Sequence, residues 1–494
     1  MYFRGVLRLS ESAIRILALV CALTALAPSG SPRAEPSAEL SAAIEATLVA
    51  HPGLVEIQPG DRFLAGVDDA ELEALLTRTA RGEWDASTES AVWVVLEGFS
   101  RESGPMAAYG RSLTSQLAGA AAAGENPEAL RALARILGRF LEDPSHEYSI
   151  LAQGLLSEKI RCGAASRGDD ELVRRITAQV NPDRELDRGG TDGTVADRYG
   201  LHERADLFSV AARGKLIAAA GYFGTVIVSR DGGTSWSVPN TGTDEPLYAV
   251  AFGADEEIWA AGRAGVVIRS EDGGVTWTRR PTPFDRHVFG LHATAPGVVL
   301  AVGDYGLQLR SSDGGAHWAC IPREQDVILG RIASAGPDAI GAGEFGTLER
   351  LPRGVPPGRR GVLSGVPPDL YLFDVWSDAD GVVGVAVGLG GAVVRSEDGG
   401  ATWSRVAVPF ERDLFGVGGS GARVVVSGEG GLLALSEDAG RSFRRMDSPI
   451  ATVTLTDVEF ADAGQVHVVG SRGIVLRSDD GGATFRVARG GGGS

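Results

Sequence analysis

The sequence predicts an all-β propeller of seven blades, preceded by a small all-α domain and a signal peptide. Three observations predict this arrangement: a repeated eight-residue phrase, a G-x-x-G step that recurs seven times, and a change from helical to strand-like patterning near residue 200. A fixed period of about 40 residues built from short strands is typical of propellers, with one blade in each period.

The repeated phrase follows the pattern S-x-D-G-G-x-T-W, and six copies of it occur. Their aspartates are separated by 41, 41, 85, 40 and 42 residues. Because 85 is close to double the other spacings, one copy is absent from an otherwise regular series. The six aspartates are Asp231, Asp272, Asp313, Asp398, Asp438 and Asp480.

Two other marks give the number of blades as seven. The G-x-x-G steps begin at Gly221, Gly262, Gly303, Gly343, Gly388, Gly428 and Gly470. Apolar runs that suit a first strand begin near Leu207, Leu247, Val288, Ile328, Leu372, Leu414 and Leu455. The step at Gly343 lies inside the 85-residue gap, where a Pro/Gly/Arg-rich insertion from Leu351 replaces the phrase. We therefore expect seven blades over residues 206–489, with the fourth the least regular.

The chemistry of the phrase indicates a structural role. Its Ser and Asp side chains can accept or donate hydrogen bonds that lock a turn, and its glycines adopt positive φ without steric cost. The closing Trp or Phe buries a large ring against the strands. Repetition on six blades argues against a catalytic role for any one copy. The twelve-residue ligand pattern of a calcium loop is absent, so no metal is predicted here.

At these residues the chain resembles known families. S-x-D-x-G-x-T-W is the Asp-box, or bacterial neuraminidase repeat, of sialidases, xyloglucanases and sortilin-type receptors. The fuller phrase at Gly262–Trp277 and Gly388–Trp403 is similar to the propellers of the photosystem II assembly-factor family. That resemblance covers all seven blades and implies an exported, non-enzymatic protein that binds membrane-protein subunits during assembly. The helical region departs from the family, which leaves a photosynthetic complex and another envelope complex as alternatives.

The region before the blades divides into a leader, a helical part and a linker. Residues 1–34 carry Arg4, Arg8, a short apolar run and then small residues and prolines, as secretory signal peptides do. We expect export to the periplasm or the extracellular space, with no membrane span left after cleavage. Residues 35–180 show helical spacing, with Asp68 and Asn126 as expected N-caps and Pro127 at a first helical position. Residues 181–205 are polar like a linker, and 490–494 form a flexible tail.

Charge, cysteines and histidines bear on the partners and cofactors that the sequence predicts. The formal net charge of −17 disfavours nucleic acid, which binds basic faces. Cys162 and Cys320 fit either one disulfide in an oxidising compartment or two separate thiols. No histidine and cysteine spacing matches a metal site, and no cofactor is predicted.

One propeller face is the candidate binding surface. Loops that join the second and third strands share that face with the loops that lead into the next blade. Aromatic side chains beside mixed charges are usual on protein-binding faces, and the alternative is a set of ordinary solvated loop tips. The candidate residues within the G-x-x-G steps are Tyr222, Phe223, Arg263, Asp304, Tyr305, Glu344, Phe345 and Arg472.

Two arginines extend this candidate surface. Arg286 and Arg412 each follow an acid just before a first strand, so they either reach the central opening or pair locally with Asp285 and Glu411. A further arginine precedes the box serine on several third strands, at Arg269, Arg310, Arg395 and Arg477. Strand alternation sends these side chains outward, where they form either a solvated strand face or a basic stripe for an acidic partner.

An enzymatic function is disfavoured. Sialidases need clustered arginines, a Tyr–Glu nucleophile pair and an R-I-P phrase before the boxes, and no R-I-P occurs in this sequence. The expected function is therefore that of a non-enzymatic propeller that binds other proteins, as an assembly or stability factor for an envelope or membrane complex. The alternative is a carbohydrate-binding or sialidase-like propeller.

Overall fold

The computed structural model describes residues 75, 78, 84–100, 127–142, 157, 160–165, 167–180, 201–280, 282–321, 327–335, 338–352, 366–367 and 369–490. The chain divides into two compact units, Met1–Arg184 and Glu185–Ser494. Several expectations fall outside the described residues: the signal peptide at 1–34, the caps at Asp68 and Asn126, the tail at 491–494 and most of the insertion after Pro352.

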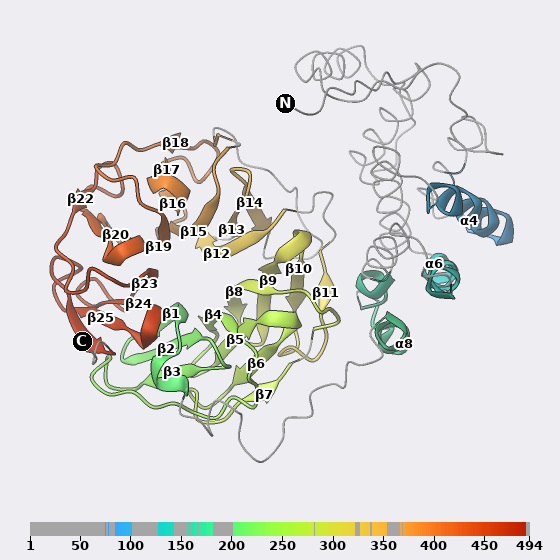
Figure 1. Cartoon of the computed structure of the whole chain (residues 1–494), viewed down its shortest axis with the longest axis horizontal. Coiled ribbons are helices and arrows are strands. Elements are labelled where there is room, and N and C mark those ends of the chain that lie inside the picture. The colour runs from blue at the N-terminus through green and yellow to red at the C-terminus, as the bar shows by residue number, and fades with distance from the viewer. Residues whose placement is uncertain are drawn as a thin grey trace, which may run out of the picture. The chain divides into compact units, whose positions relative to one another are not determined.

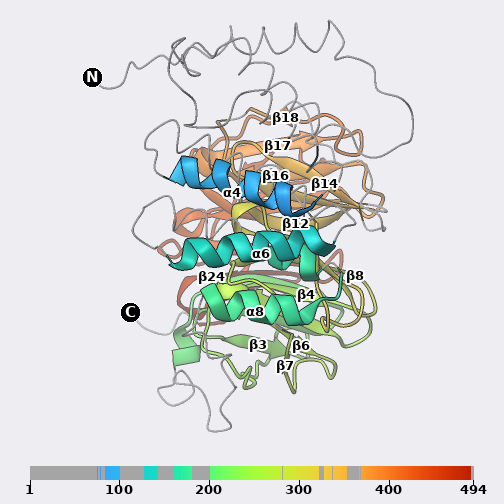
Figure 2. The same cartoon turned by 90° about the vertical axis from the view of Figure 1, so that its right-hand side faces the viewer.

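The described part of the first unit is helical. It contains α4 (Ala86–Ser100), α6 (Pro127–Glu142) and α8 (Asp170–Val180), which Figure 2 shows side by side. Asp85 caps α4, because its Oδ1 accepts a hydrogen bond from Thr88 N at 2.8 Å, and α6 begins at Pro127 as predicted. The apolar side chains of α6 whose burial is described, among them Leu133 and Ile136, are buried, and Arg135 pairs with Glu89 on α4 (Nη2 to Oε2, 2.6 Å).

The second unit is a propeller of seven blades set in a ring (Figure 1). Each blade is one antiparallel sheet made from a single contiguous stretch of chain, in which the first strand lies innermost. Among the residues described, blades one and four have three strands and the other five have four. The predicted number of blades is therefore confirmed. In blade four, the described residues contain no outer strand.

The strands of the first three blades are β1 (Leu207–Arg213), β2 (Leu216–Gly221) and β3 (Val226–Ser229); β4 (Leu247–Phe252), β5 (Ile258–Gly262), β6 (Val267–Ser270) and β7 (Thr278–Arg279); β8 (Val288–Ala295), β9 (Val298–Gly303), β10 (Gln308–Ser311) and β11 (Ala319–Cys320). Blade four has β12 (Leu329–Ala335), β13 (Asp338–Gly343) and β14 (Leu348–Pro352). The last three blades have β15 (Leu372–Ser377), β16 (Gly384–Gly388), β17 (Ala392–Ser396) and β18 (Ser404–Arg405); β19 (Leu414–Ser420), β20 (Arg423–Gly428), β21 (Leu433–Ser436) and β22 (Arg444–Arg445); β23 (Leu455–Phe460), β24 (Val466–Gly470), β25 (Val475–Ser478) and β26 (Arg486–Arg489).

Every inner strand carries a bulge at its second residue. Pairing with the second strand shifts register there in all seven blades, for example between Leu207 and Ser209 and between Leu455 and Asp457. A bulge redirects the residues that follow it. The third residue consequently contacts the next blade: Asp374 Oδ2 accepts a hydrogen bond from Val417 N at 2.8 Å, and Ser209 Oγ accepts one from Val250 N at 3.3 Å.

Blade seven closes the ring on blade one through packing and hydrogen bonds. Thr456 Oγ1 donates to Leu207 O at 2.6 Å, and Arg472 N donates to Asp206 Oδ1 at 2.7 Å. Between the sheets, Ile217 of blade one and Val469 of blade seven belong to one buried apolar cluster. All four strands of blade seven come from the end of the chain, so closure uses no strand from the first blade.

The six repeated phrases form turns with one shared set of hydrogen bonds, called here the serine–aspartate turns. In blade five, Ser396 Oγ donates to Asp398 Oδ1 at 2.8 Å and accepts a hydrogen bond from Gly400 N at 2.9 Å. Asp398 in turn accepts from Thr402 N at 2.9 Å and from Thr402 Oγ1 at 2.5 Å. The two central positions have φ between 59° and 86° in all six turns, which explains why all of these residues except Ala439 are glycines.

Arginines of a preceding blade hold these turns from outside. Arg230 Nη2 donates to Asp272 O at 2.6 Å, and Arg395 Nε donates to Ala439 O at 2.7 Å. Arg477 reaches Gly232 O in the same way. The side chains of Arg269, Arg395 and Arg477 are only 15, 8 and 14 % exposed, so strand alternation gave the wrong environment for them. Each lies in the seam between two blades and is not a solvated side chain.

Candidate functional site

The third residue of every G-x-x-G step has a left-handed backbone. Its φ is 63° at Gly390 and 61° at Gly430, where glycine meets the requirement without strain. In the other five blades a residue with a Cβ takes this conformation, which costs roughly 1–2 kcal/mol for an L-residue. These residues are Phe223 (58°), Ala264 (52°), Tyr305 (47°), Phe345 (55°) and Arg472 (61°).

Three of these strained positions carry exposed aromatic side chains. Phe223 is 40 % exposed, Tyr305 56 % and Phe345 66 %, and the neighbouring Tyr222 is 40 % exposed. Folding alone favours glycine at this position and disfavours a large exposed ring. Backbone strain that the fold does not need is concentrated at functional sites in proteins. The aromatic residues of the steps are therefore the strongest candidates for contacts with a partner.

A second set of aromatic rings connects these loops to the centre of the propeller. The bulged second residue of five inner strands is aromatic: Phe208, Tyr248, Phe289, Phe373 and Phe415. Phe208 lies 4.7 Å from Tyr222 and 5.5 Å from Tyr248, measured between ring centroids. Phe373 lies 5.0 Å from Phe415. The face therefore has two half-buried aromatic arcs, one over blades one to three and one over blades five and six.

The charged candidates of the steps differ in their availability. Arg263 and Arg472 are exposed, and Arg263 Nε lies 3.8 Å from Glu245 Oε2 in a solvent-screened pair. Glu344 Oε1 accepts a hydrogen bond from Ile328 N at 3.0 Å, and Asp304 is buried. The two acids thus contribute to the loop structure, whereas the two arginines remain accessible.

Arg286 and Arg412 lie over the G-x-x-G steps of their own blades. The Arg286 guanidinium is 4.3 Å from the centroid of the Tyr305 ring, a cation–π contact. An added Cβ at Gly430 would collide with the Arg412 guanidinium, so this arginine covers the step in blade six. Both side chains widen the candidate face, and a different arginine occupies the centre of the ring.

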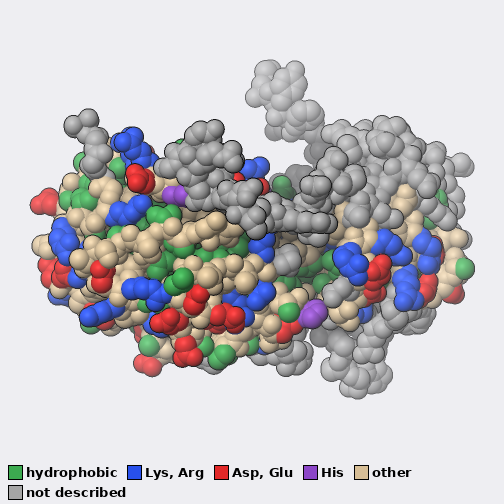
Figure 3. Space-filling model, turned by 90° about the horizontal axis from the view of Figure 1, so that it is seen from below, with side chains coloured by type: hydrophobic (Ala, Val, Ile, Leu, Met, Phe, Trp, Pro, Cys, Tyr) green, Lys and Arg blue, Asp and Glu red, His purple; other side chains and the backbone are tan. Residues whose placement is uncertain are grey.

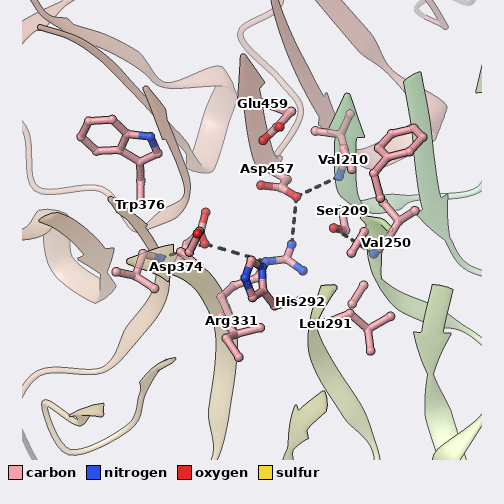
Figure 4. A pocket seen from close by; sticks show the side chains of 18 of the residues that line it. Ser209, Val210, Val250, Leu291, His292, Arg331, Asp374, Trp376, Asp457 and Glu459 are labelled. Atoms are coloured by element: carbon pink, nitrogen blue, oxygen red, sulfur yellow. Dashed lines mark hydrogen bonds and ion pairs between the residues drawn. The ribbon is translucent and has the colours of Figure 1, made fainter. Parts of the chain in front are cut away.

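That central residue is Arg331, the third residue of β12. Its Nη2 donates to Phe208 O at 2.6 Å and its Nη1 to Tyr248 O at 3.0 Å, in blades one and two. Its Nη2 also lies 3.3 Å from Asp457 Oδ2, and its Nε is 4.0 Å from Asp374 Oδ1 (Figure 4). The guanidinium therefore spans the ring from blade four to blades one, two, five and seven.

Two layers of side chains line the channel. The third residues of the inner strands are Ser209, Ala249, Gly290, Arg331, Asp374, Gly416 and Asp457. The fifth residues point to the same side, because side chains two apart in a strand share a face. They are Ala211, Ala251, His292, Ala333, Trp376, Gly418 and Glu459. The small residues leave a cavity of about 440 Å³ beside the large ones.

Burial raises the pKa of the carboxyl groups in this cavity. Desolvation and the neighbouring Asp457 and Asp374 raise the pKa of Glu459 to about 8. Desolvation also raises the pKa of Asp374 and Asp457, and the Arg331 charge and backbone N–H groups oppose that shift. Asp457 has the closer contact with Arg331, at 3.3 Å against 4.0 Å for Asp374.

Sequence reasoning missed this central cluster, although the sequence contains a signal for it. Alignment of the seven inner strands from their first apolar residue places Arg331, Asp374 and Asp457 in one column of otherwise small residues. Charges in such a column face one another because the strands form a ring. Within its own blade, none of these charged residues has a sequence neighbour that would reveal the cluster.

Beyond this site, the described surface carries mixed charges. Acidic and basic side chains are interspersed over the propeller edge in Figure 3, without a single-sign patch on that side. No helix in the described residues is long and apolar enough to cross a membrane. The described residues also contain no group of three or more His, Cys, Asp or Glu side chains placed to hold a metal ion.

Comparison with known proteins found likeness among solved structures. No protein-family model matches the chain, and no curated protein matches it. Similar structures include YCF48 bound to D1 peptide, with 18 % identity, a TM-score of 0.48 and coverage of 56 % of this chain and 94 % of that one. YCF48 from Cyanidioschyzon merolae has 18 % identity, a TM-score of 0.46 and coverage of 56 and 96 %. The WD40 β-propeller domain of Doa1 has 14 % identity, a TM-score of 0.45 and coverage of 57 and 93 %.

Proposed function

We propose that the protein is an exported, non-enzymatic binding protein whose G-x-x-G face holds a segment of another protein. In this proposal it acts as an assembly or stability factor for an envelope or membrane complex, as the resemblance of its repeats to photosystem II assembly factors implies. The observation that carries the proposal is the left-handed backbone under Phe223, Tyr305 and Phe345. Glycine would suit each position better, so contact with a partner is the reason for an aromatic side chain there.

The chemistry of the face suits a polypeptide partner. Large aromatic rings and arginines dominate the binding energy of protein interfaces. Here Tyr305 lies beneath the Arg286 guanidinium, and Tyr222 continues into the arc that Phe208 and Tyr248 form. Apolar side chains of a bound segment would pack on the rings, and its carbonyl or carboxylate oxygens would accept hydrogen bonds from the exposed arginines.

The geometry also supports binding over glycoside hydrolysis. A glycosidase needs two carboxyl groups directed at one bond of the sugar. On this face Glu344 accepts a backbone hydrogen bond and Asp304 is buried. In the channel, Asp374 and Asp457 accept hydrogen bonds from backbone N–H groups, and Arg331 lies against both.

Replacement of the strained aromatics by glycine tests the proposal without harming the fold. We expect the triple variant Phe223→Gly, Tyr305→Gly and Phe345→Gly to keep or raise the melting temperature, because glycine relieves the left-handed strain. The same variant should lose the protein partner in crosslinked co-purification from envelope fractions. Ala264→Gly is the matched control, since it changes the same backbone position without removing a ring.

A photo-crosslinking residue gives the second readout. Placed at Tyr305 it should capture a protein, whereas placed at Val275, a 61 % exposed position in a serine–aspartate turn, it should not. Capture from Val275 alone, full partner recovery with the triple variant, or recovery of glycans without protein would each contradict the proposal.

A further inference from the structure

The cavity in the channel lies along the carboxyl-terminal halves of the inner strands. Its lining includes Arg213, Phe252, Ser377 and Glu459, which are at or near the ends of β1, β4, β15 and β23. The turns after these strands bond to the serine–aspartate turns, for example through Gly273 N to Glu256 O at 3.0 Å. The cavity is therefore on the side of the propeller opposite the G-x-x-G face. Its volume of about 440 Å³ is in the range of small-ligand sites.

Arg331 closes the cavity toward the G-x-x-G face and has few hydrogen-bond donors left for a ligand. Its two terminal nitrogens donate to the carbonyl oxygens of Phe208, Tyr248 and Phe289 and to Asp457. Its Nε faces Asp374 at 4.0 Å. The guanidinium is thus held in place by backbone dipoles and carboxylates, and it forms one wall of the cavity.

The carboxyl groups outnumber this cation. Asp374, Asp457 and Glu459 all line the cavity, whereas Arg331 is the one arginine within the channel layers of the described inner strands. Two other groups that can be cationic line it: His292, on the wall, and Arg213, at the rim, where its Nη1 donates to Asp255 O at 2.9 Å. Figure 4 shows Glu459 next to Asp457 on β23, facing the cavity that His292 and Trp376 also line.

We propose that this cavity binds a primary ammonium group carried on an aliphatic chain. The ammonium would donate to the Glu459 carboxylate and to Asp374, since an ammonium has three donors and carboxylates are pure acceptors. Ala211, Ala251 and Ala333 leave room for the methylene chain and give it apolar contacts. The chemistry is shared by a free aliphatic diamine and by a lysine side chain of a docked protein segment, and the experiment separates these two sources.

The ionisation of Glu459 supplies an independent signature of binding. Its neighbours are Asp457 on the same strand, Asp374, Arg331, His292 and Arg213, and burial together with the two aspartates holds its pKa at about 8. At pH 7 the group is mostly protonated, so an arriving cation must displace its proton. Ammonium binding should therefore release protons into the buffer.

Calorimetry on the full chain at pH 7 tests the inference, with cadaverine as the free diamine and 1,5-pentanediol as its uncharged counterpart. We expect cadaverine to bind and the diol not to bind. The measured binding heat should differ between phosphate and Tris buffers, because the two buffers take up the released proton with different enthalpies. Glu459→Gln should weaken cadaverine binding at least tenfold, and Glu411→Gln, an exposed acid before β19, should leave it unchanged.

A blocked Gly-Lys-Gly peptide decides the source of the ammonium. Tighter binding of the peptide than of cadaverine identifies a lysine side chain, and the reverse order identifies a free amine. Should neither compound bind, or should Glu459→Gln bind cadaverine as the unmodified protein does, the inference is overturned. Equal binding of the diol would overturn it as well. None of these outcomes bears on the G-x-x-G face, which the glycine variants test separately.

Discussion

Arg331 Nη2 lies 3.3 Å from Asp457 Oδ2 and joins blade four to blade seven across the centre of the ring. The two residues are 126 positions apart in the chain. Their side chains are only 15 and 10 % exposed, so the pair is largely removed from solvent. The same guanidinium caps backbone carbonyls of blades one and two, which makes it a common contact for inner strands on opposite sides of the channel.

Removal of Arg331 should therefore destabilise the propeller strongly. Arg331→Met leaves Asp457 buried without its cation and uncovers the carbonyls, and we expect a loss of about 3–5 kcal/mol at neutral pH. Urea unfolding measures this loss. Adding Asp457→Asn to Arg331→Met should restore part of the stability, because the unpaired charge is then gone. Unchanged stability of the single variant would show that the central pair contributes nothing.

The serine of a serine–aspartate turn should matter more than an exposed serine of the same blade. Ser396 is 2 % exposed and accepts a hydrogen bond from the buried Gly400 N, so Ser396→Ala should cost about 1–3 kcal/mol. Ser404→Ala is the control, since Ser404 is exposed and its Oγ is 3.5 Å from Arg395 O. Equal urea midpoints for the two variants would contradict a locking role for the turn.

Acid should unfold the propeller through the turn aspartates. Hydrogen bonds from the hydroxyl and backbone of Thr276 lower the pKa of Asp272 to about 2 from its ordinary 3.8, and those of Thr402 do the same for Asp398. Because the pKa of each aspartate is lower in the folded protein than in the unfolded chain, its ionised form stabilises the fold above pH 3.8. That stabilisation is lost as the pH falls toward 2. We expect circular dichroism to show this loss between those values. Asp272→Asn combined with Asp398→Asn should make the acid transition shallower.

Glu459 should have the opposite pH dependence. Its pKa of about 8 lies above the ordinary 4.5, so the folded state binds a proton more tightly than the unfolded chain. The protonated Glu459 side chain makes its whole contribution to the free energy of unfolding below pH 4.5. That contribution declines as the pH rises toward 8. Glu459→Gln should therefore gain about 1–3 kcal/mol relative to the unmodified protein between pH 5 and pH 8. Parallel urea titrations at the two pH values check this, and a constant difference between the proteins would refute it.

The sequence was sufficient for the architecture because the repeats encode it locally. The first strands begin at Leu207, Leu247 and Val288, where the apolar runs placed them, and β12 begins at Leu329, one residue after the expected Ile328. Each blade is a short-range antiparallel sheet, so the order of its strands follows from turn chemistry within about 40 residues. The helical spacing before the blades likewise matches α6 and its start at Pro127.

The candidate sites were only partly predictable, because they depend on contacts between blades. The G-x-x-G steps pointed to Phe223, Tyr305 and Phe345, yet only backbone angles show that these residues are strained. The arginines of the third strands were misread, because alternation within a strand does not say that the next blade covers Arg395. The central cluster requires the ring to be closed before Arg331 meets Asp457.

Closure without a shared strand has a mechanical consequence. The propeller begins with the residues before β1 and ends with β26, so both of its ends meet at the contact between blades one and seven (Figure 1). A pulling force applied to the two ends loads that contact directly, against hydrogen bonds such as Thr456 to Leu207 and a layer of apolar packing. The ring should therefore open first between blades one and seven. Arg331 would still connect these two blades through its contacts with Phe208 and Asp457 while that interface is under load.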